Sequence, residues 1–428
     1  MMMTIAMTRR MFAARASCLA MAGLCSFMAS AATASDWPRF RGPNGSGQSS
    51  DVGVPVEIGE SKNVLWKVAL PGAGNSSPVV ANGRIYLQTA SDDGKKRSLV
   101  CLDLAGGKTL WTQSAPGEPA KTHGKNTLAS CTAAVDGVRV YMPFWNGQKL
   151  SVSAFDCDGH PAWTTDLGNF TSQHGAGHSP IVVGNNVIIA NDQDGLAEVV
   201  ALDANTGVVA WKKSRQPFRA SYSTPILVER KGHEPELLIA STQGITGYDP
   251  ATGDERWSWA WKSNQQELRT VGSPIVCQNI VFFSGGNGPG ARHAVAVDLN
   301  GKTAGGRPDF AWETQKDFPY VPCMLSRDEN VYFINDAGIA GCFNAKAGKN
   351  VWMKRLDGGD VTASPLMVDN RIYAFTENGT VFVFAAEPKF NQLFSGRLDE
   401  GVKASPAVAD GRLIVRGERH LYCFGSKD

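Results

Sequence analysis

Tryptophan recurs along this chain at a nearly constant interval, and this repeat limits the possible folds more than any other feature of the sequence. Successive copies are separated by 40 to 55 residues. A repeat of this length is typical of a four-stranded propeller blade, which buries its hydrophobic faces only against neighbouring copies. The series consists of Trp66, Trp111, Trp163, Trp211, Trp257, Trp312 and Trp352, and Phe394 continues it.

Each interval has the same internal order of strand and turn signals. A Ser-Pro pair or a variant opens the first strand, where proline is tolerated because its missing N–H lies at a strand end. The third strand ends in Asp-x-x-Thr-Gly, as at Asp203 to Gly207, where Asp accepts backbone N–H groups and glycine supplies a positive φ. The expected strand openings are Ser77-Pro78, Ser130-Cys131, Ser179-Pro180, Thr224-Pro225, Ser273-Pro274, Val321-Pro322, Ser364-Pro365 and Ser405-Pro406.

Eight openings predict an all-β fold over residues 63–428, an eight-bladed β-propeller of four-stranded antiparallel blades. The last copy ends near Phe424 after only three strands, whereas the strand at 63–68 precedes the first blade. We expect this N-terminal strand to join the last blade and close the ring, because closure removes the open sheet edges. Deleting the chain through Lys67 should then destabilise the ring more than trimming residues 36–60.

Residues 1–34 are predicted to be a signal peptide, and residues 35–62 an N-terminal extension of the propeller. Arg9, Arg10 and Arg15 flank the start of a small, apolar run that ends in the cleavage site Ala32-Thr33-Ala34. The arginine pair also resembles a twin-arginine signal, so export follows either the Sec or the twin-arginine route. The expected location is the periplasm or cell envelope. A transmembrane anchor is the alternative interpretation of the same apolar run.

Removing the signal peptide changes the net charge and narrows the range of partners. The 42 basic residues lose three and the 40 acidic residues lose none, so the formal charge moves from +2 to −1. No cluster of Lys and Arg is long enough to follow a phosphate backbone, which argues against nucleic acid as a partner. After cleavage we expect a monomer that does not span the membrane.

Seven cysteines remain in the mature chain, an odd number with no C-x-x-C spacing. This pattern indicates neither a disulfide framework nor a zinc site. Cys101, Cys342 and Cys423 occupy a third-strand position that holds small residues such as Ala201 and Gly247 in other copies. We therefore expect these thiols to be buried and inert.

The Ser-Pro strand, the Asp-x-x-Thr-Gly turn before Trp and the eightfold count resemble the pyrroloquinoline-quinone (PQQ) repeat family, from about Trp66 to Phe424. The mature N-terminus, Asp36-Trp37-Pro38-Arg39-Phe40-Arg41-Gly42-Pro43, also resembles the opening of exported bacterial PQQ-like propellers. The resemblance implies one of two kinds of protein, both built on the same ring.

Quinoprotein alcohol dehydrogenases, the first kind, bind PQQ and calcium on the propeller axis and usually carry adjacent cysteines over the cofactor. They are longer than this chain, which has no Cys-Cys pair. The second kind resembles the propeller lipoprotein of the outer-membrane β-barrel assembly machinery, a compact docking scaffold without a cofactor. Size and the missing cysteine pair favour the second kind. Leu24 before Cys25 does not match a lipidation site, which counts against that specific role.

Propeller topology brings the loops before each innermost strand to one face, around the axis. From these loops we predict a ligand-binding set on the axial face: His174, His178, Arg219, Tyr222, Arg269, Tyr320, Asp360 and Lys403. The two histidines could share a metal with Asp192 or Asp194, and the alternative is a glycine-rich loop with two solvated imidazoles. No catalytic residues are identified.

The leading functional hypothesis is an exported, non-catalytic scaffold that binds an envelope protein or a small ligand on its axial face, without a cofactor. The main alternative is a PQQ- and calcium-dependent quinoprotein dehydrogenase that oxidises an alcohol or sugar. In that case Arg219, Arg269 and Lys403 would face the carboxylates of PQQ, with Asp or Asn side chains holding Ca²⁺. A propeller that binds or cleaves glycans is a third possibility.

Overall fold

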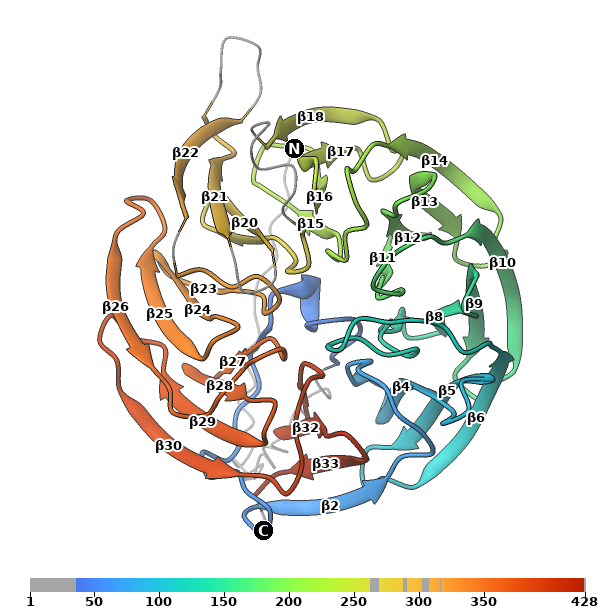
Figure 1. Ribbon diagram of the computed structural model, residues 1–428, viewed down its shortest axis with the longest axis horizontal. Coiled ribbons are helices and arrows are strands. Elements are labelled where there is room, and N and C mark those ends of the chain that lie inside the picture. The colour runs from blue at the N-terminus through green and yellow to red at the C-terminus, as the bar shows by residue number, and fades with distance from the viewer. Residues whose placement is uncertain (1–35, 262–268, 288–290, 302–307, 316, 427–428) are drawn as a thin grey trace, which may run out of the picture. The chain divides into compact units, whose positions relative to one another are not determined.

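The computed structural model describes residues 36–261, 269–287, 291–301, 308–315 and 317–426. The signal peptide predicted at 1–34 lies outside these residues. The described chain belongs to one compact unit, Ala34–Asp428. As predicted, this unit is an all-β propeller with eight blades arranged in a ring (Figure 1). Among the described residues, no helix has the length and apolar character needed to cross a membrane.

Each blade contributes four antiparallel strands, ordered from the axis outward. Blade 1 contains β3(Val79–Ala81), β4(Arg84–Ala90), β5(Lys96–Asp103) and β6(Thr109–Pro116), and blade 2 contains β7(Ala134–Val135), β8(Arg139–Trp145), β9(Lys149–Asp156) and β10(Pro161–Asn169). Blade 3 contains β11(Ile181–Val183), β12(Asn186–Asn191), β13(Ala197–Asp203) and β14(Val209–Arg215), and blade 4 contains β15(Ile226–Val228), β16(Glu236–Ser241), β17(Gly244–Tyr248) and β18(Glu255–Ala260).

The remaining four blades follow the same plan, with two additions from the N-terminal part of the chain. Blade 5 contains β19(Ile275–Cys277), β20(Ile280–Gly286), β21(Arg292–Asp298) and β22(Asp309–Thr314), and blade 6 contains β23(Leu325–Arg327), β24(Asn330–Ile334), β25(Ile339–Asn344) and β26(Asn350–Arg355). Blade 7 contains β27(Leu366–Val368), β28(Arg371–Phe375), β29(Thr380–Ala385) and β30(Gln392–Arg397), with β1(Gln48–Ser49) added in parallel to β27. Blade 8 contains β31(Ala407–Ala409), β32(Arg412–Arg416), β33(His420–Phe424) and, as its outer strand, β2(Val64–Ala69).

The two ends of the described chain meet in blade 8. Strand β2 pairs antiparallel with β33, and Trp66 lies opposite Cys423. Figure 1 shows the blue β2 beside the red β33. The repeated Trp and the small third-strand residue are cross-strand partners in other blades as well, for example Trp111 opposite Cys101. All three of Cys101, Cys342 and Cys423 are fully buried, as expected for that position.

The repeated tryptophan contacts the next blade in most copies; Trp257 is an exception, because its indole N–H donates to Glu236 of the same blade. The Trp163 indole N–H donates to the carbonyl of Ala204 in the following blade at 3.0 Å. Its ring packs on Gly207 of the Thr-Gly turn, where an added Cβ would lie 2.5 Å from the indole. Gly207 also has a φ of 71°, so this turn requires glycine for two separate reasons. Equivalent contacts to a carbonyl of the next blade are made by Trp66, Trp111, Trp312 and Trp352.

A ring of hydrogen bonds surrounds the axis at the start of the innermost strands. The backbone N–H at one blade's position donates to the side chain at the next blade's position, at 2.9 to 3.1 Å, in seven of the eight neighbouring pairs, including Ser405 to Ser77. Among the described residues, the step from Ser179 to Thr224 is the one without this bond. We call these positions the belt: Ser77, Thr132, Ser179, Thr224, Ser273, Cys323, Ser364 and Ser405.

The positions of the belt residues show that two predicted strand openings are misplaced. The expected openings at Ser130-Cys131 and Val321-Pro322 are wrong by two residues, because Thr132 and Cys323 occupy the belt in blades 2 and 6. Neither belt residue precedes a proline, so a nearby pair resembled the repeat better. The acceptor side chain, rather than the proline, is the shared feature.

The N-terminal stretch at 36–49, which we call the axial segment, is packed into the ring. Figure 1 shows it in blue across the centre. Trp37 exchanges two backbone hydrogen bonds with Val80 of blade 1, and the Arg41 guanidinium donates to the Met324 carbonyl of blade 6 at 2.6 Å. Asn44 bonds to Leu227 of blade 4. The stretch predicted as an N-terminal extension therefore contacts blades 1, 4 and 6.

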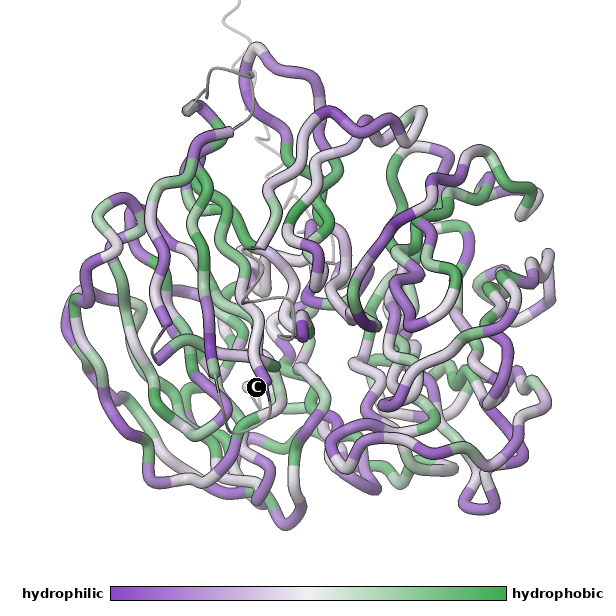
Figure 2. Tube along the Cα trace, turned by 45° about the horizontal axis from the view of Figure 1, so that its top comes forward, coloured by the Kyte–Doolittle hydropathy of each residue, from purple (hydrophilic) through white to green (hydrophobic). Residues whose placement is uncertain are grey.

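Hydrophobic residues fill the spaces between blades, and polar residues dominate the periphery. Figure 2 shows hydrophobic positions in green along the inner and middle strands and hydrophilic positions in purple along outer strands and loops. Strand β5 is almost entirely buried, whereas alternate residues of the outer strand β6 are exposed. The rigid inner strands thus hold the loops around the axis in fixed positions.

Candidate ligand-binding site on the propeller axis

A pocket of about 820 Å³ lies on the axis and is lined by residues from all eight blades. The loops before the innermost strands form its wall. Belt side chains, including Ser77 and Ser405, and Phe40 of the axial segment also line it. The pocket therefore ends against the belt and the axial segment. We call the side of the ring that carries these loops the pocket face.

Seven of the eight predicted ligand-binding residues line this pocket: His174, Arg219, Tyr222, Arg269, Tyr320, Asp360 and Lys403. His178 is different, because it is only 2% exposed and packs edge-on against Phe170. Its Nε2 lies 3.1 Å from the carbonyl oxygen of Asp192. Burial lowers the pKa of His178, which favours a neutral imidazole inside the blade.

The two predicted metal ligands, Asp192 and Asp194, have other partners. Both carboxylate oxygens of Asp192 accept hydrogen bonds from the Arg215 guanidinium, at 2.7 and 3.1 Å, in a fully buried ion pair. Asp194 accepts the backbone N–H of Ala220 at 2.8 Å. The described residues contain no group of three or more His, Cys, Asp or Glu side chains that could hold a metal ion.

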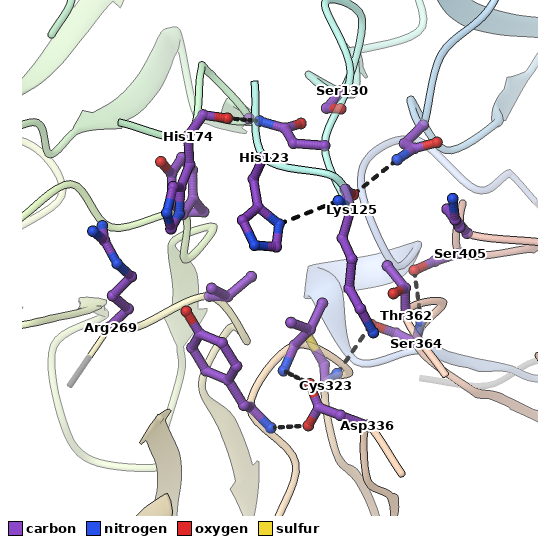
Figure 3. Close-up of a pocket in the computed structure, with 18 of the residues that line it drawn as sticks. His123, Lys125, Ser130, His174, Arg269, Cys323, Asp336, Thr362, Ser364 and Ser405 are labelled. Atoms are coloured by element: carbon purple, nitrogen blue, oxygen red, sulfur yellow. Dashed lines mark hydrogen bonds between the residues drawn. The ribbon is translucent and has the colours of Figure 1, made fainter. Parts of the chain in front are cut away.

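The sequence did not identify three further wall residues, His123, Lys125 and Gln173. The first two lie in the long loop before blade 2, where the misplaced strand opening hid their position relative to the axis. The His123 and His174 rings are 4.7 Å apart, centroid to centroid. Figure 3 shows this pair and Arg269 on one side of the pocket, with Lys125, Thr362 and Ser405 on the other.

Basic groups outnumber acidic groups on the pocket wall. Five cationic side chains line it, Lys125, Arg219, Arg269, Arg292 and Lys403, against the two carboxylates of Asp336 and Asp360, a formal excess of +3. The pKa of His174 is lowered to about 4, first by burial and then by the nearby charges of Arg269 and His123. Its imidazole is therefore neutral near pH 7, and the surrounding potential is positive.

Some of these charges are already paired. Lys125 bonds to Glu377 at 2.7 Å, and the two backbone N–H groups of Tyr320 and Val321 donate to the Asp336 carboxylate at 2.7 and 3.2 Å. By contrast, Arg219 and Lys403 form no ion pair with any residue that the structure describes. The pocket can therefore accept negative charge from outside.

A family model described as outer membrane protein assembly factor BamB matches residues 48–151, 148–308 and 337–428. Among curated proteins, outer membrane protein assembly factor BamB of Moranella endobia (strain PCIT) is 27% identical over 183 residues, which is 41% of this chain. The match spans 42% of that relative's own length.

Solved structures share the ring. BamB from Moraxella catarrhalis has a TM-score of 0.61 at 14% identity, covering 85% of this chain and 97% of that one. Quinohemoprotein alcohol dehydrogenase from Comamonas testosteroni has a TM-score of 0.63 at 14% identity, covering 92% and 81%. At such identity the likeness extends to the fold alone, and BamB and an alcohol dehydrogenase share that fold.

Proposed function

Because this chain belongs to the family described as outer membrane protein assembly factor BamB, we propose that it is a non-catalytic propeller of the cell envelope. In this proposal the pocket face docks a protein that takes part in outer membrane protein assembly. Propellers suit this role because a rigid ring presents many loops on one face.

Two exposed hydrophobic side chains on the pocket face carry the proposal. Leu196 lies in the loop between β12 and β13 and is 73% exposed, and Phe218 lies between β14 and β15 and is 50% exposed. The Asp194–Ala220 hydrogen bond joins their two loops. Apolar groups of this size beside a charged pocket are typical of a protein interface, where aromatic and aliphatic anchors supply most of the affinity.

The absence of a PQQ and calcium requirement is also part of the proposal, and the pocket's carboxylates support it. Calcium needs several oxygen ligands around one point. The two wall carboxylates already have partners, since Asp336 accepts two backbone N–H groups and Asp360 lies 3.9 Å from the Lys125 ammonium. Among the described wall residues, the Thr362 hydroxyl donates to the Glu377 carboxylate at 2.6 Å, but that carboxylate already pairs with the Lys125 ammonium, which makes it a poor general base.

The experiment compares two paired variants of the full mature chain in the native host. Leu196→Asp with Phe218→Asp should lower co-purification with the outer membrane assembly complex by at least about 10-fold, since each buried anchor contributes on the order of 1–2 kcal/mol. The matched control, Val138→Asp with Val208→Asp, changes side chains that are 62% and 65% exposed in turns of the opposite face.

Equal loss of co-purification in both pairs, or none in either, would contradict docking on the pocket face. Dye reduction by the purified chain that depends on added PQQ and calcium would overturn the non-catalytic assignment itself.

A further inference from the structure

The axial pocket is built to receive negative charge. Its wall has a formal excess of +3, and two of its cations, Arg219 and Lys403, lie on opposite sides of the ring in blades 4 and 8 without an ion-pair partner among the described residues. Fixed positive charge inside a concave, partly buried site attracts an anion more strongly than the same charge on an open surface.

Arg269 has an unused donor inside this wall. The side chain is only 5% exposed, its Nη2 donates to the Gln173 side chain at 2.9 Å, and its buried Nη1 has no hydrogen-bond partner among the residues that the structure describes. A buried donor without an acceptor destabilises the folded state, and a charged donor does so more strongly. A carboxylate that entered beside Gln173 would supply the missing acceptor in the planar geometry that guanidinium prefers.

The belt adds neutral donors at the closed end of the pocket. Five belt hydroxyls that line it, Ser77, Thr132, Ser179, Ser364 and Ser405, each accept one backbone N–H from the neighbouring blade. In the described part of the chain, none of these hydroxyls donates its own proton to a protein acceptor. Each O–H is therefore available to an anionic oxygen on the axis.

The axial segment restricts how a ligand can reach these donors. Phe40 lines the pocket, and the axial segment crosses the ring beside the belt. A chain cannot pass through a pocket that is closed in this way, so the ligand must be a small molecule or the end of a longer one. Tyr222 on the wall offers an apolar ring face to its organic part.

We propose that the axial pocket binds a carboxylate-bearing ligand, with Arg269 and Arg219 as its anchors and the belt hydroxyls as additional donors. This inference rests on the proposed binding role of the pocket face. A carboxylate fits better than a phosphate dianion, because Asp336 and Asp360 also line the pocket and repel a second negative charge. The carboxylate has two sources, a free organic acid or the C-terminus of a polypeptide.

Calorimetric titration of the mature chain tests the proposal without any partner protein. The probes are benzoate, inorganic phosphate, and one short peptide prepared both with a free C-terminus and with an amidated one. We expect saturable binding of benzoate or of the free-acid peptide. Binding of benzoate alone identifies a free organic acid as the source, and discrimination between the two peptides identifies a chain end.

Two variants and one control assign the site. Arg219→Gln and Arg269→Gln should each weaken that binding by at least about 10-fold, the usual effect of losing one charge-assisted hydrogen bond. Lys108→Gln removes an exposed charge from a turn between β5 and β6, away from the pocket, and should leave affinity unchanged. Arg219 is half-buried and unpaired, so its variant tests the site even if Arg269→Gln fails to fold.

The proposal is overturned if no carboxylate binds, if phosphate binds in its place, or if both arginine variants bind as the parent does. Failure of this titration does not affect the co-purification experiment with the Leu196 and Phe218 variants, because that experiment measures protein docking without any added acid. The two proposals can thus fail separately.

Discussion

The contact between Gly42 and Trp37 gives the sharpest test of the axial segment. Gly42 has a φ of 67°, and a Cβ added there would lie 2.4 Å from the Trp37 ring. Gly53 provides a matched control, since its φ is 84° and nothing lies within 4 Å of an added Cβ. Gly42→Ala and Gly53→Ala both place an alanine at a positive φ, and only the first displaces a ring.

The expected free energies follow from burial. A positive φ costs an alanine about 1–3 kcal/mol. Gly42 also has a ψ of −149°, in a region of the backbone map that is essentially restricted to glycine. Trp37 is 1% exposed. Moving a buried indole into water exposes about 200 Å², or about 5 kcal/mol at about 25 cal/mol per Å². Since the ring can shift without leaving its site completely, we expect Gly42→Ala to cost about 4 kcal/mol and Gly53→Ala about 1 kcal/mol.

Scanning calorimetry measures the difference. With about 2.1 cal/mol/K of unfolding entropy per residue over about 390 residues, 4 kcal/mol lowers the melting temperature by about 5 °C and 1 kcal/mol by about 1 °C. In a Trp37→Ala background, Gly42→Ala should lose its additional cost, because the obstructing ring is gone. Equal shifts for the two glycine variants, or an unchanged cost without the ring, would refute the reasoning.

Three further outcomes are expected. In the mature chain Cys157, the only half-buried thiol among the described cysteines, should be the one that a maleimide labels within minutes at pH 8; fast labelling of two or more contradicts this. Asp192→Asn should lower the free energy of unfolding in urea by about 3–5 kcal/mol, because it leaves the buried Arg215 without its charged partner. Glu57→Gln, in an exposed ion pair, is the control and should lower it by less than about 1 kcal/mol. The pKa of His174 is about 4 in the folded chain, below its unfolded value of about 6.5. The unfolded chain therefore binds more protons in this range, and the free energy of unfolding falls as the pH drops from about 6.5 to 4. His174→Asn should reduce this dependence of the unfolding free energy on pH, and an unchanged dependence excludes His174 as its cause.

The sequence predicted the ring because the repeat encodes contacts between neighbouring blades. Trp163 and Gly207 belong to consecutive copies of the motif, and the equivalent contact recurs at Trp66, Trp111, Trp211 and Trp312. Counting copies is therefore equivalent to counting blades. The same argument explains the third-strand cysteines, since Cys101 lies opposite Trp111 in a space that accepts only small residues.

The openings of blades 2 and 6 show the limit of such pattern recognition. Proline is easy to see in a sequence, but the belt depends on a side chain that accepts a neighbour's N–H. Thr132 and Cys323 meet that requirement without proline. A search for an acceptor two residues before each inner strand would have found them.

Topology predicted which loops surround the axis, but it could not predict the direction of each side chain. Arg219 and Arg269 line the pocket, whereas His178 and Asp192, from the same face, are turned into the blade and paired there. That choice depends on burial and on partners in other strands, such as Arg215. No local pattern reports such contacts.

Two pairs of arginines near the axis have different roles. Arg39 and Arg41 of the N-terminal motif donate to the carbonyls of Pro225 and Met324 in blades 4 and 6, so they connect the segment to the ring. Arg219 and Arg269, which no repeat motif marks, line the pocket instead. The N-terminal motif therefore indicates how the axial segment is attached to the ring, and it does not indicate which ligand binds in the pocket. Changes in the motif should alter stability first, and changes in the loop arginines should alter binding at nearly constant stability. Identifying a ligand for such a propeller therefore depends on the loops, where the repeat gives no guidance.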